Sequence, residues 1–263
     1  MIITNTQLDD DVLIGRLGNK LFVIASILGA AKSYGNDKRP TFPHWKYEHV
    51  FKHKLFYYDS EPAIDYIYTE PHFHFAPIDV RRRGNVNLAG YFQSWKYFDH
   101  IYDDIKYYFE PSDDILSYIK EKYNNLLSIN NTVSIHVRRG DYIKLCDHHP
   151  PITVKYILDA MNQFATNSIF VFFSDDIEWC KSKFGKISVR QIEFVNDEPH
   201  VDMFLMSMMK SNIIANSSLS WWAAYLNKNE YKKVIYPDPW FGKGYSHNMN
   251  DLCPENWKKI SCS

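Results

Sequence analysis

Four polar residues with the chemistry of an anion site stand at the end of an apolar run. The segment HVRRGDY, residues 136–142, contains His136, Arg138, Arg139 and Asp141. It ends an alternating apolar stretch that begins at Val133. A guanidinium group forks onto phosphate or carboxylate oxygens with two parallel hydrogen bonds and stays charged at any working pH. The segment therefore predicts an anion site at a strand end, with a surface ion pair as the alternative.

The spacing of these residues divides their roles. Side chains alternate along a strand, so His136 and Arg138 are expected on one face and Arg139 on the other. One arginine can then contact a ligand while Asp141 or another carboxylate holds its neighbour. Gly140 would let the backbone approach the ligand closely.

A second polar segment, FFSDD at 172–176, also follows an apolar run. A carboxylate here could accept the N1–H and exocyclic amine of a guanine, the two adjacent donors that distinguish guanine from adenine. The alternative is helix capping, because Ser174 and Asp175 are both good N-cap residues.

The third segment, ANSSLSWWAAYL at 215–226, delivers Asn216, Ser217 and Ser218 into the first turn of an expected helix. Free backbone N–H groups and hydroxyls at a helix start form an anion site. Capping by the same residues is compatible with that function.

A fourth segment, GRLGN at 15–19, permits a tight turn before a helix that Asn19 could cap. It matches neither the GxGxxG nor the GK[ST] pattern, so Rossmann and P-loop labels do not apply. By itself it predicts only a weak ligand loop.

No metal site is expected. The acidic run at 9–11 contains a formal DxD, but it is isolated near the terminus and is interpreted as a solvated start. The histidine pairs at 72 and 74 and at 148 and 149 lack a completed ligand set. The four cysteines are scattered without a CxxC pair, which favours free thiols.

The first half of the chain is irregular. We expect a short strand at 11–14, a buried helix at 20–34, a strand at 87–92 and a helix at 111–127 with Ser112 as its N-cap. Residues 40–85 are rich in Pro, His and aromatic residues without a sustained period, and are expected to form a subdomain beside a groove.

The second half alternates regularly. Strands are expected at 132–137, 168–173, 191–194, 212–215 and 234–236, and helices at 153–163, 177–184, 201–209 and 220–225. This alternation predicts an α/β fold with a parallel sheet covered on both faces, in which ligands bind at the carboxyl ends of the strands. The polar stretch 124–131 separates the halves, giving domains 1–128 and 129–263.

Composition excludes other classes of protein. A formal net charge of −1 over 263 residues argues against a nucleic-acid binder with a broad basic face. The start lacks the pattern of a secretory signal, and no run approaches the roughly 18 apolar residues that span a membrane. An aromatic content of 16% supplies large core side chains and suits stacking on sugars or bases.

Together these segments resemble the α-1,2-fucosyltransferase family. IHVRRGDY is similar to its HxRRxD motif, GYFQSWKYF at 90–98 to its GYFQS segment, and IIANSSLSWWAAYL to its NSSxSWWAA segment. FSDD lies between them as expected, and GRLGN resembles the family's GGLGNQ loop. Arg16 and Lys20 depart from that loop and resemble the GRxGN loop of protein O-fucosyltransferases.

The resemblance implies a GT-B-like fold with two Rossmann-type lobes and parallel sheets. Lobe 1–128 would lie on the acceptor side, lobe 129–263 would bind the GDP-sugar, and the donor site would occupy the C-terminal lobe and the inter-lobe cleft. The implied reaction transfers fucose from GDP-fucose, with inversion and without a metal or other cofactor, to a galactose-containing oligosaccharide or glycoconjugate.

Residue roles follow from the same resemblance. Arg138 would contact the diphosphate and glycosidic oxygen with support from Arg139, and residues 40–85, which match the family poorly, would help to choose the acceptor. The sequence does not assign a base: Asp141, Asp147 and His149 are candidates near the donor motif, and Asp141 is either brace or base. The other implied donor-binding residues are Asn19, Arg16, His136, Asp175, Asn216, Ser217 and Ser218, and the acceptor-side residues are Tyr91, Gln93, Trp95 and His149.

Two alternatives stay open: a glycosyltransferase of this architecture with another donor or linkage, and a non-catalytic nucleotide- or glycan-binding relic. The lack of an anchor favours a cytoplasmic enzyme of bacterial or viral type, or one peripheral to a membrane.

Overall fold

The computed structural model describes residues 1–35 and 38–262, and its internal contacts form two compact units. The first unit comprises Met1–Asp113 and His247–Pro254, and the second comprises Asp114–Ser246 and Glu255–Ser263. No helix in these described ranges is both long and apolar enough to cross a membrane.

The division between the units falls earlier than the boundary expected at residues 128 and 129. Helices α3 (Asp113–Lys122) and α4 (Asn124–Leu127) lie almost wholly in the second unit. Asp197 explains this placement, because its carboxylate accepts hydrogen bonds from Tyr118, Lys122 and Tyr123 at 2.8–3.0 Å. The polar stretch at 124–131 is therefore no linker: part of it is helical.

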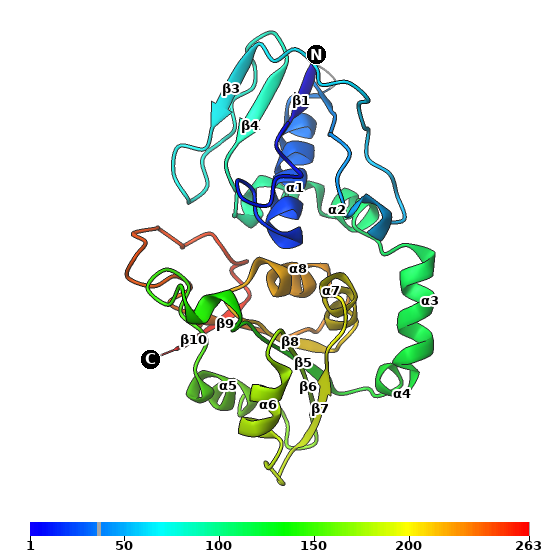
Figure 1. Cartoon of the computed structure of the whole chain (residues 1–263), viewed down its shortest axis with the longest axis vertical. Coiled ribbons are helices and arrows are strands. Elements are labelled where there is room, and N and C mark those ends of the chain that lie inside the picture. Colours follow the sequence, from blue (N-terminus) through cyan, green and yellow to red (C-terminus); the bar gives the residue numbers. More distant parts are fainter. Residues whose placement is uncertain (36–37, 263) are drawn as a thin grey trace. The chain divides into compact units, whose positions relative to one another are not determined.

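The first unit is built on a four-stranded parallel sheet in the order β2-β1-β4-β3. Figure 1 labels β1, β3 and β4 of this sheet. Its strands are β1 (Ile2–Thr4), β2 (Arg39–Pro40), β3 (Tyr66–Thr69) and β4 (Val86–Ala89). Its helices are α1 (Leu17–Ser33), α2 (Tyr102–Tyr108) and the 3₁₀ turns η2 (Glu48–Val50), η3 (Trp95–Tyr97) and η4 (Asp99–Ile101).

The acidic start of the chain is organised around a buried ammonium group. Lys20 is fully buried, and its Nζ donates to the Leu8 carbonyl at 2.6 Å and lies 3.2 Å from Asp11 and 3.8 Å from Asp9. The pKa of Lys20 is lowered by burial. The predicted strand at 11–14 is wrong, because these residues form turns, and the acidic run is no simple solvated start.

Helix α1 is buried along nearly its whole length, as its apolar sequence predicted. It begins at Leu17 rather than at residue 20, with Arg16 as an N-cap that makes no side-chain capping hydrogen bond. Asn19 therefore lies inside the first turn and does not cap the helix, contrary to the prediction.

The second unit holds a six-stranded parallel sheet in the order β10-β9-β8-β5-β6-β7. Its strands are β5 (Thr132–Val137), β6 (Ile169–Ser174), β7 (Gln191–Val195), β8 (Ser211–Ile213), β9 (Val234–Asp238) and β10 (Lys258–Ser261). Its other helices are η5 (Asp141–Ile143), α5 (Val154–Met161), α6 (Ile177–Phe184), α7 (Pro199–Ser207) and α8 (Ser218–Leu226).

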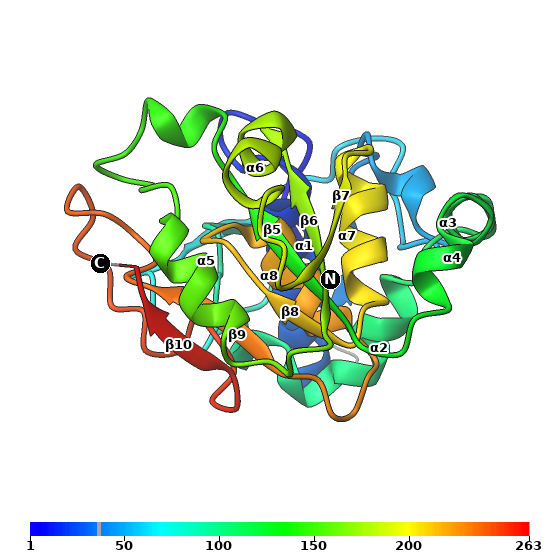
Figure 2. The same ribbon diagram turned by 90° about the horizontal axis from the view of Figure 1, so that it is seen from below.

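The predicted α/β architecture of this unit is confirmed. Figure 1 shows α5 and α6 on one face of the sheet and α7 and α8 on the other, and Figure 2 shows the same layers from below. Strand β5 matches its predicted range, and most other elements differ by one to three residues at an end. Strand β10 was not foreseen.

Strand register brings the polar segments together. Val137 at the end of β5 pairs with Ser174 at the end of β6, and Ile135 pairs with Ile213 at the end of β8. Because these strands are parallel, the residues that follow each of them emerge at one edge of the sheet.

Gly29 lets α1 approach the backbone at the end of η3. A Cβ added at Gly29 would lie 2.1 Å from the Tyr97 carbonyl oxygen.

Gly29→Ala should lower the free energy of unfolding by about 1–3 kcal/mol because the helix and turn must separate. Chemical denaturation should show this loss, whereas the exposed Lys32→Ala in the same helix should change stability by less than about 0.5 kcal/mol. Helix propensity alone would make Gly29→Ala more stable than the wild type. An unchanged or higher free energy of unfolding would therefore contradict the close contact.

Candidate functional site

The two adjacent arginines have separate partners at the edge where β5 and β6 end. Arg138 donates to Asp141 at 2.6 Å and lies 2.8 Å from Asp175. Arg139 donates from Nε to Asp176 at 3.0 Å, and its guanidinium carbon lies 4.0 Å from the Trp179 ring centroid. Each guanidinium group is therefore oriented by its own carboxylates.

Asp175 and Asp176 hold the β5–η5 turn from the neighbouring strand. Asp175 Oδ1 accepts from the Arg139 backbone N–H at 2.9 Å, and a Cβ added at Gly140 would lie 2.6 Å from Asp175 Oδ2. The lack of a side chain at Gly140 therefore makes room for the Asp175 carboxylate in this structure. Asp176, rather than the predicted Ser174 or Asp175, is the N-cap of α6 and accepts from the Trp179 backbone N–H at 3.2 Å.

The charges in this cluster leave an excess of carboxylate. Two arginines face three aspartates, namely Asp141, Asp175 and Asp176. Asp141 is the most exposed of the three, at 42% of its side-chain area. An anion that displaces a carboxylate from Arg138 would displace Asp141 more readily than Asp175, because the more exposed Asp141 side chain is more easily hydrated.

His136 supports the cluster from inside the sheet as a neutral imidazole. It is 5% exposed, and burial, followed by the charge of Arg138, lowers its pKa to about 3. Its Nδ1 is buried without a hydrogen-bond partner among the described residues. A neutral ring with a vacant nitrogen can accept or donate a hydrogen bond to a ligand.

Helix α8 begins beside this cluster with its first turn uncapped by a side chain. Ser217 is the N-cap and makes no side-chain capping hydrogen bond, and Ser218 is the first helical residue. Asn216 holds the segment that leads into α8: its Nδ2 donates to the carbonyls of Pro150 and Trp240 at 2.9 Å. An uncapped helix start offers N–H groups and a positive dipole to an anion.

Aromatic rings pack over the loop that follows the arginines. His149 stacks on Tyr142 with ring centroids 5.0 Å apart and contacts Phe241 and Tyr245 edge-on. The Tyr142 hydroxyl donates to the Asn216 carbonyl at 2.9 Å, which ties this loop to the start of α8. Burial lowers the pKa of His149, which favours its neutral form.

The predicted residues of the first unit form a separate cluster. Gln93 Nε2 donates to Asn19 Oδ1 at 3.0 Å. Gly15 has φ +89°, and a Cβ there would lie 2.6 Å from Asn19 Nδ2, so the loop before α1 requires glycine. Arg16 is exposed beside it. Tyr91 and Trp95 flank Gln93, whereas His149 belongs to the second unit.

Asp202 is a candidate functional residue that the sequence reasoning missed. It lies in the first turn of α7, after β7, and is 7% exposed with Oδ1 unpartnered within the described chain. Burial, followed by the charge of Asp197, raises its pKa to about 8. The available signal was a single acidic residue inside the apolar run VDMFLM.

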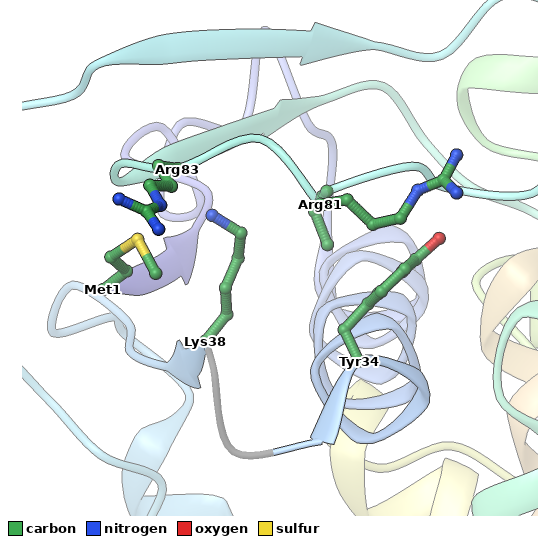
Figure 3. A pocket seen from close by; sticks show the side chains of 6 residues that line it. Met1, Tyr34, Lys38, Arg81 and Arg83 are labelled. Carbon is green, nitrogen blue, oxygen red and sulfur yellow. The ribbon is translucent and has the colours of Figure 1, made fainter.

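A basic cavity of about 540 Å³ lies elsewhere in the first unit (Figure 3). Its lining residues are Met1, Tyr34, Lys38, Val80, Arg81 and Arg83, none of them predicted for the site. Met1 and Lys38 precede β1 and β2, so this cavity lies at the amino ends of the strands. Residues 70 and 90, which follow β3 and β4, lie at the opposite edge of the same sheet.

Within residues 1–35 and 38–262, no group of three or more His, Cys, Asp or Glu side chains is arranged to hold a metal ion.

Solved structures with a similar fold include those of two fucosyltransferases. NodZ, an α-1,6-fucosyltransferase soaked with GDP-fucose, matches with a TM-score of 0.57 and 13% identity, covering 90% of this chain and 95% of its own. A variant of FUT1 from Arabidopsis thaliana, in complex with GDP, matches with a TM-score of 0.57 and 13% identity over 99% of this chain and 76% of its own. The fold class is therefore GT-B-like.

Sequence comparison identifies the family. Residues 3–260 match the model of glycosyl transferase family 11, so the chain belongs to that family. It is 35% identical to an α-1,2-colitosyltransferase of Escherichia coli over 70% of this chain, and 32% identical to the O-antigen biosynthesis glycosyltransferase WbnK of the same organism over 65%. These matches span 65% and 59% of the two relatives, less than two thirds of either.

A more distant relative is galactoside α-(1,2)-fucosyltransferase 2 of Pongo pygmaeus, 27% identical over 81% of this chain and 67% of its own length.

The protonation of Asp202 should make stability depend on pH. Its folded-state pKa of about 8 lies above its ordinary value of 3.8. The stabilisation from its bound proton is thus complete below about pH 4 and is lost as the pH rises towards 8. Asp202→Asn has a neutral side chain at every pH. In denaturant titrations its free energy of unfolding should fall less between pH 4 and pH 9 than that of the wild type, with a difference of up to a few kcal/mol.

Asp159→Asn, an exposed aspartate on α5, serves as the control and should keep the wild-type pH dependence. If Asp202→Asn also kept that dependence, Asp202 would already be ionised in the folded protein.

Proposed function

We propose that the protein transfers L-fucose from GDP-β-L-fucose to the 2-hydroxyl of a terminal galactose-type sugar, forming an α-1,2 linkage with inversion. Membership of glycosyl transferase family 11 and similarity to a galactoside α-(1,2)-fucosyltransferase support this activity. The observation that carries the proposal is that Arg138 and the uncapped start of α8 follow neighbouring parallel strands, at one edge of the sheet.

The chemistry requires such an arrangement. Cleavage of the fucose–phosphate bond leaves positive charge on the sugar and negative charge on the departing GDP. Fixed cations and oriented N–H groups can stabilise that diphosphate without reorganising. Arg138 and the first turn of α8, at Ser217 and Ser218, would supply them, and no step in this proposal uses a metal.

Donor binding would change the partners of Arg138. The diphosphate would replace Asp141 on the guanidinium, while Asp175 keeps Arg138 oriented and Asp176 keeps Arg139 in place. Asp141, once released, would be an exposed carboxylate beside the leaving group. It combines both roles expected of it, a brace before donor binding and a base afterwards.

The remaining donor contacts are carried over from the family resemblance. His136 would contact ribose or guanine through its neutral imidazole, and the resemblance alone assigns Asn19 and Arg16 to the donor. Asp175 stays a candidate guanine acceptor, although arginine donors occupy both of its oxygens in this structure.

A second donor is favoured by one observation. The relative at 35% identity is an α-1,2-colitosyltransferase. Colitose is L-fucose without its 3-hydroxyl, so both sugars place the same groups around the anomeric carbon. Only a contact to the 3-hydroxyl would separate the two donors.

The identity of the donor is tested by nucleotide release. Purified protein should release GDP from GDP-fucose or GDP-colitose with a β-galactoside acceptor, and mass-spectrometric linkage analysis should find a 1,2 linkage. Release from GDP-mannose or UDP-sugars instead would replace the proposed donor. Binding of GDP, seen as a thermal shift, without turnover of any donor would leave a non-catalytic binding protein.

Removal of Arg138 tests the mechanism. Arg138→Ala should lower kcat by a factor of the order of 10² or more, as loss of one electrostatic donor to the leaving group does. Steady-state kinetics with the active donor measure the change. Arg190→Ala, at the amino end of β7, removes an arginine from the opposite edge of the sheet and should leave kcat unchanged. Near-normal kcat in Arg138→Ala would refute the role of this guanidinium.

A further inference from the structure

Two segments of the first unit meet where β3 and β4 end. Thr69 pairs with Ala89 in the parallel register, and the Glu70 backbone N–H donates to the Ala89 carbonyl at 2.8 Å. Glu70 is therefore brought against the turn that begins at Gly90, inside the GYFQSW segment.

One oxygen of Glu70 holds this turn in an unusual shape. Oε2 accepts from the backbone N–H groups of Tyr91 at 2.8 Å and Phe92 at 3.1 Å. Phe92 has φ +50°, a left-handed conformation that is uncommon for an aromatic residue and costs of the order of 1 kcal/mol or more. Gly90 has φ +151°, and a Cβ there would lie 2.4 Å from Glu70 Cβ.

The other oxygen of Glu70 is unused. Oε1 is buried without a hydrogen-bond partner in the described part of the chain, and burial raises the pKa of Glu70. A buried acceptor left without a donor costs about 1–3 kcal/mol, so a structural role alone does not explain it. The Oε2 contacts already suffice to hold the turn.

An unused donor and an exposed ring lie in the same segment. Trp95 Nε1 is buried and likewise lacks a partner within the described residues. Tyr91 is 41% exposed, and Gln93 is fixed by its hydrogen bond to Asn19. Glu70 and this segment together thus offer one unpartnered acceptor, one unpartnered donor and an aromatic face.

A sugar is the ligand class that matches this combination. Each hydroxyl both donates and accepts a hydrogen bond, and the C–H face of a pyranose packs on an aromatic ring. A phosphate fits poorly, because it cannot donate to a carboxylate and would be repelled by it. A purely apolar ligand would leave both polar atoms unpaired.

We propose that Glu70 Oε1 accepts a hydrogen bond from a hydroxyl of the acceptor sugar, with Trp95 Nε1 donating to a second sugar oxygen and the Tyr91 ring packing against the pyranose. This inference rests on the proposed transfer to a galactose-type acceptor, and it assigns the acceptor contact on the first unit to a residue outside the family-like motifs. Glu70 has two functions: Oε2 positions the GYFQSW turn and Oε1 binds substrate.

Glu70→Gln separates the two functions of this carboxylate. The amide oxygen can still accept from Tyr91 and Phe92, whereas the amide nitrogen replaces the vacant acceptor with a donor. We expect the acceptor KM to rise at least ten-fold, while the donor KM and the melting temperature stay close to wild type. Glu48→Gln, the same substitution at a glutamate in η2 that pairs with His44, should change none of these values.

Trp95→Phe provides a second variant, which keeps an aromatic ring but removes the N–H group together with the five-membered ring of the indole. It should raise the acceptor KM several-fold with the donor KM unchanged. If Glu70 only braces the turn, Glu70→Gln will instead keep the acceptor KM of the wild type, or will change the donor KM and melting temperature together. Either result overturns the proposal.

A binding measurement keeps this inference separate from the proposed reaction. Saturation-transfer NMR with methyl β-D-galactoside, in the absence of any donor, should show binding to wild type and Glu48→Gln and at least ten-fold weaker binding to Glu70→Gln. Failure of all donors to turn over, with this binding pattern intact, would refute the transferase activity alone. Equal galactoside binding by Glu70→Gln and wild type, or none by wild type, would refute the sugar site at Glu70.

Discussion

The parallel register of β5 with β6 and β8 is the constraint on which the candidate site depends. Val137 lies beside Ser174, and Ile135 lies beside Ile213, so three polar segments distant in sequence emerge at one edge of the sheet. A one-residue slip in β5 would reverse the faces of Arg138 and Arg139 and remove each guanidinium from its carboxylates. The apolar strand interiors, including Val133, therefore determine the electrostatics at the strand ends.

This edge is assembled as a nearly compensated charge cluster rather than as an open cationic pocket. Arg138 shares Asp141 and Asp175, and Arg139 is held by Asp176 and the Trp179 ring. Compensation avoids the cost of partly buried, unpaired guanidinium groups in the empty protein. It also means that an anionic ligand gains only the difference between its own attraction and that of the carboxylate it displaces.

Much of the second unit could be predicted because its periodicity is strong. The apolar strands and the helices between them gave the sheet and the positions of its polar ends, and the arginine–aspartate pairing was expected in outline. The choice of Asp176 rather than Asp175 as the α6 cap was not predictable, because neighbouring acidic residues cap equally well until tertiary contacts engage one of them. Here Arg138 and the Arg139 backbone N–H bind Asp175, and Asp176 caps the helix. Asp202 escaped notice because its role depends on burial, which a short helix pattern does not reveal.

The first unit resisted prediction for a different physical reason. Its strands have only two to four residues, too few to show alternation, and tertiary contacts define them. The turn at 11–14 exists because Lys20 needs carboxylates within reach, and the left-handed Phe92 exists because Glu70 holds two successive N–H groups. Both features link residues far apart in sequence, and no local pattern encodes them.

The side chain of Asn216 has a consequence for engineering the specificity of this protein. Its amide nitrogen donates to the carbonyls of Pro150 and Trp240, and the backbone carbonyl of the same residue accepts from the Tyr142 hydroxyl. One residue thereby fixes the loop after β5, the loop after β9 and the start of α8 to a common point. Replacing only the loop after β5, or only the loop after β9, would break these hydrogen bonds. The two loops therefore have to be redesigned together to change selectivity.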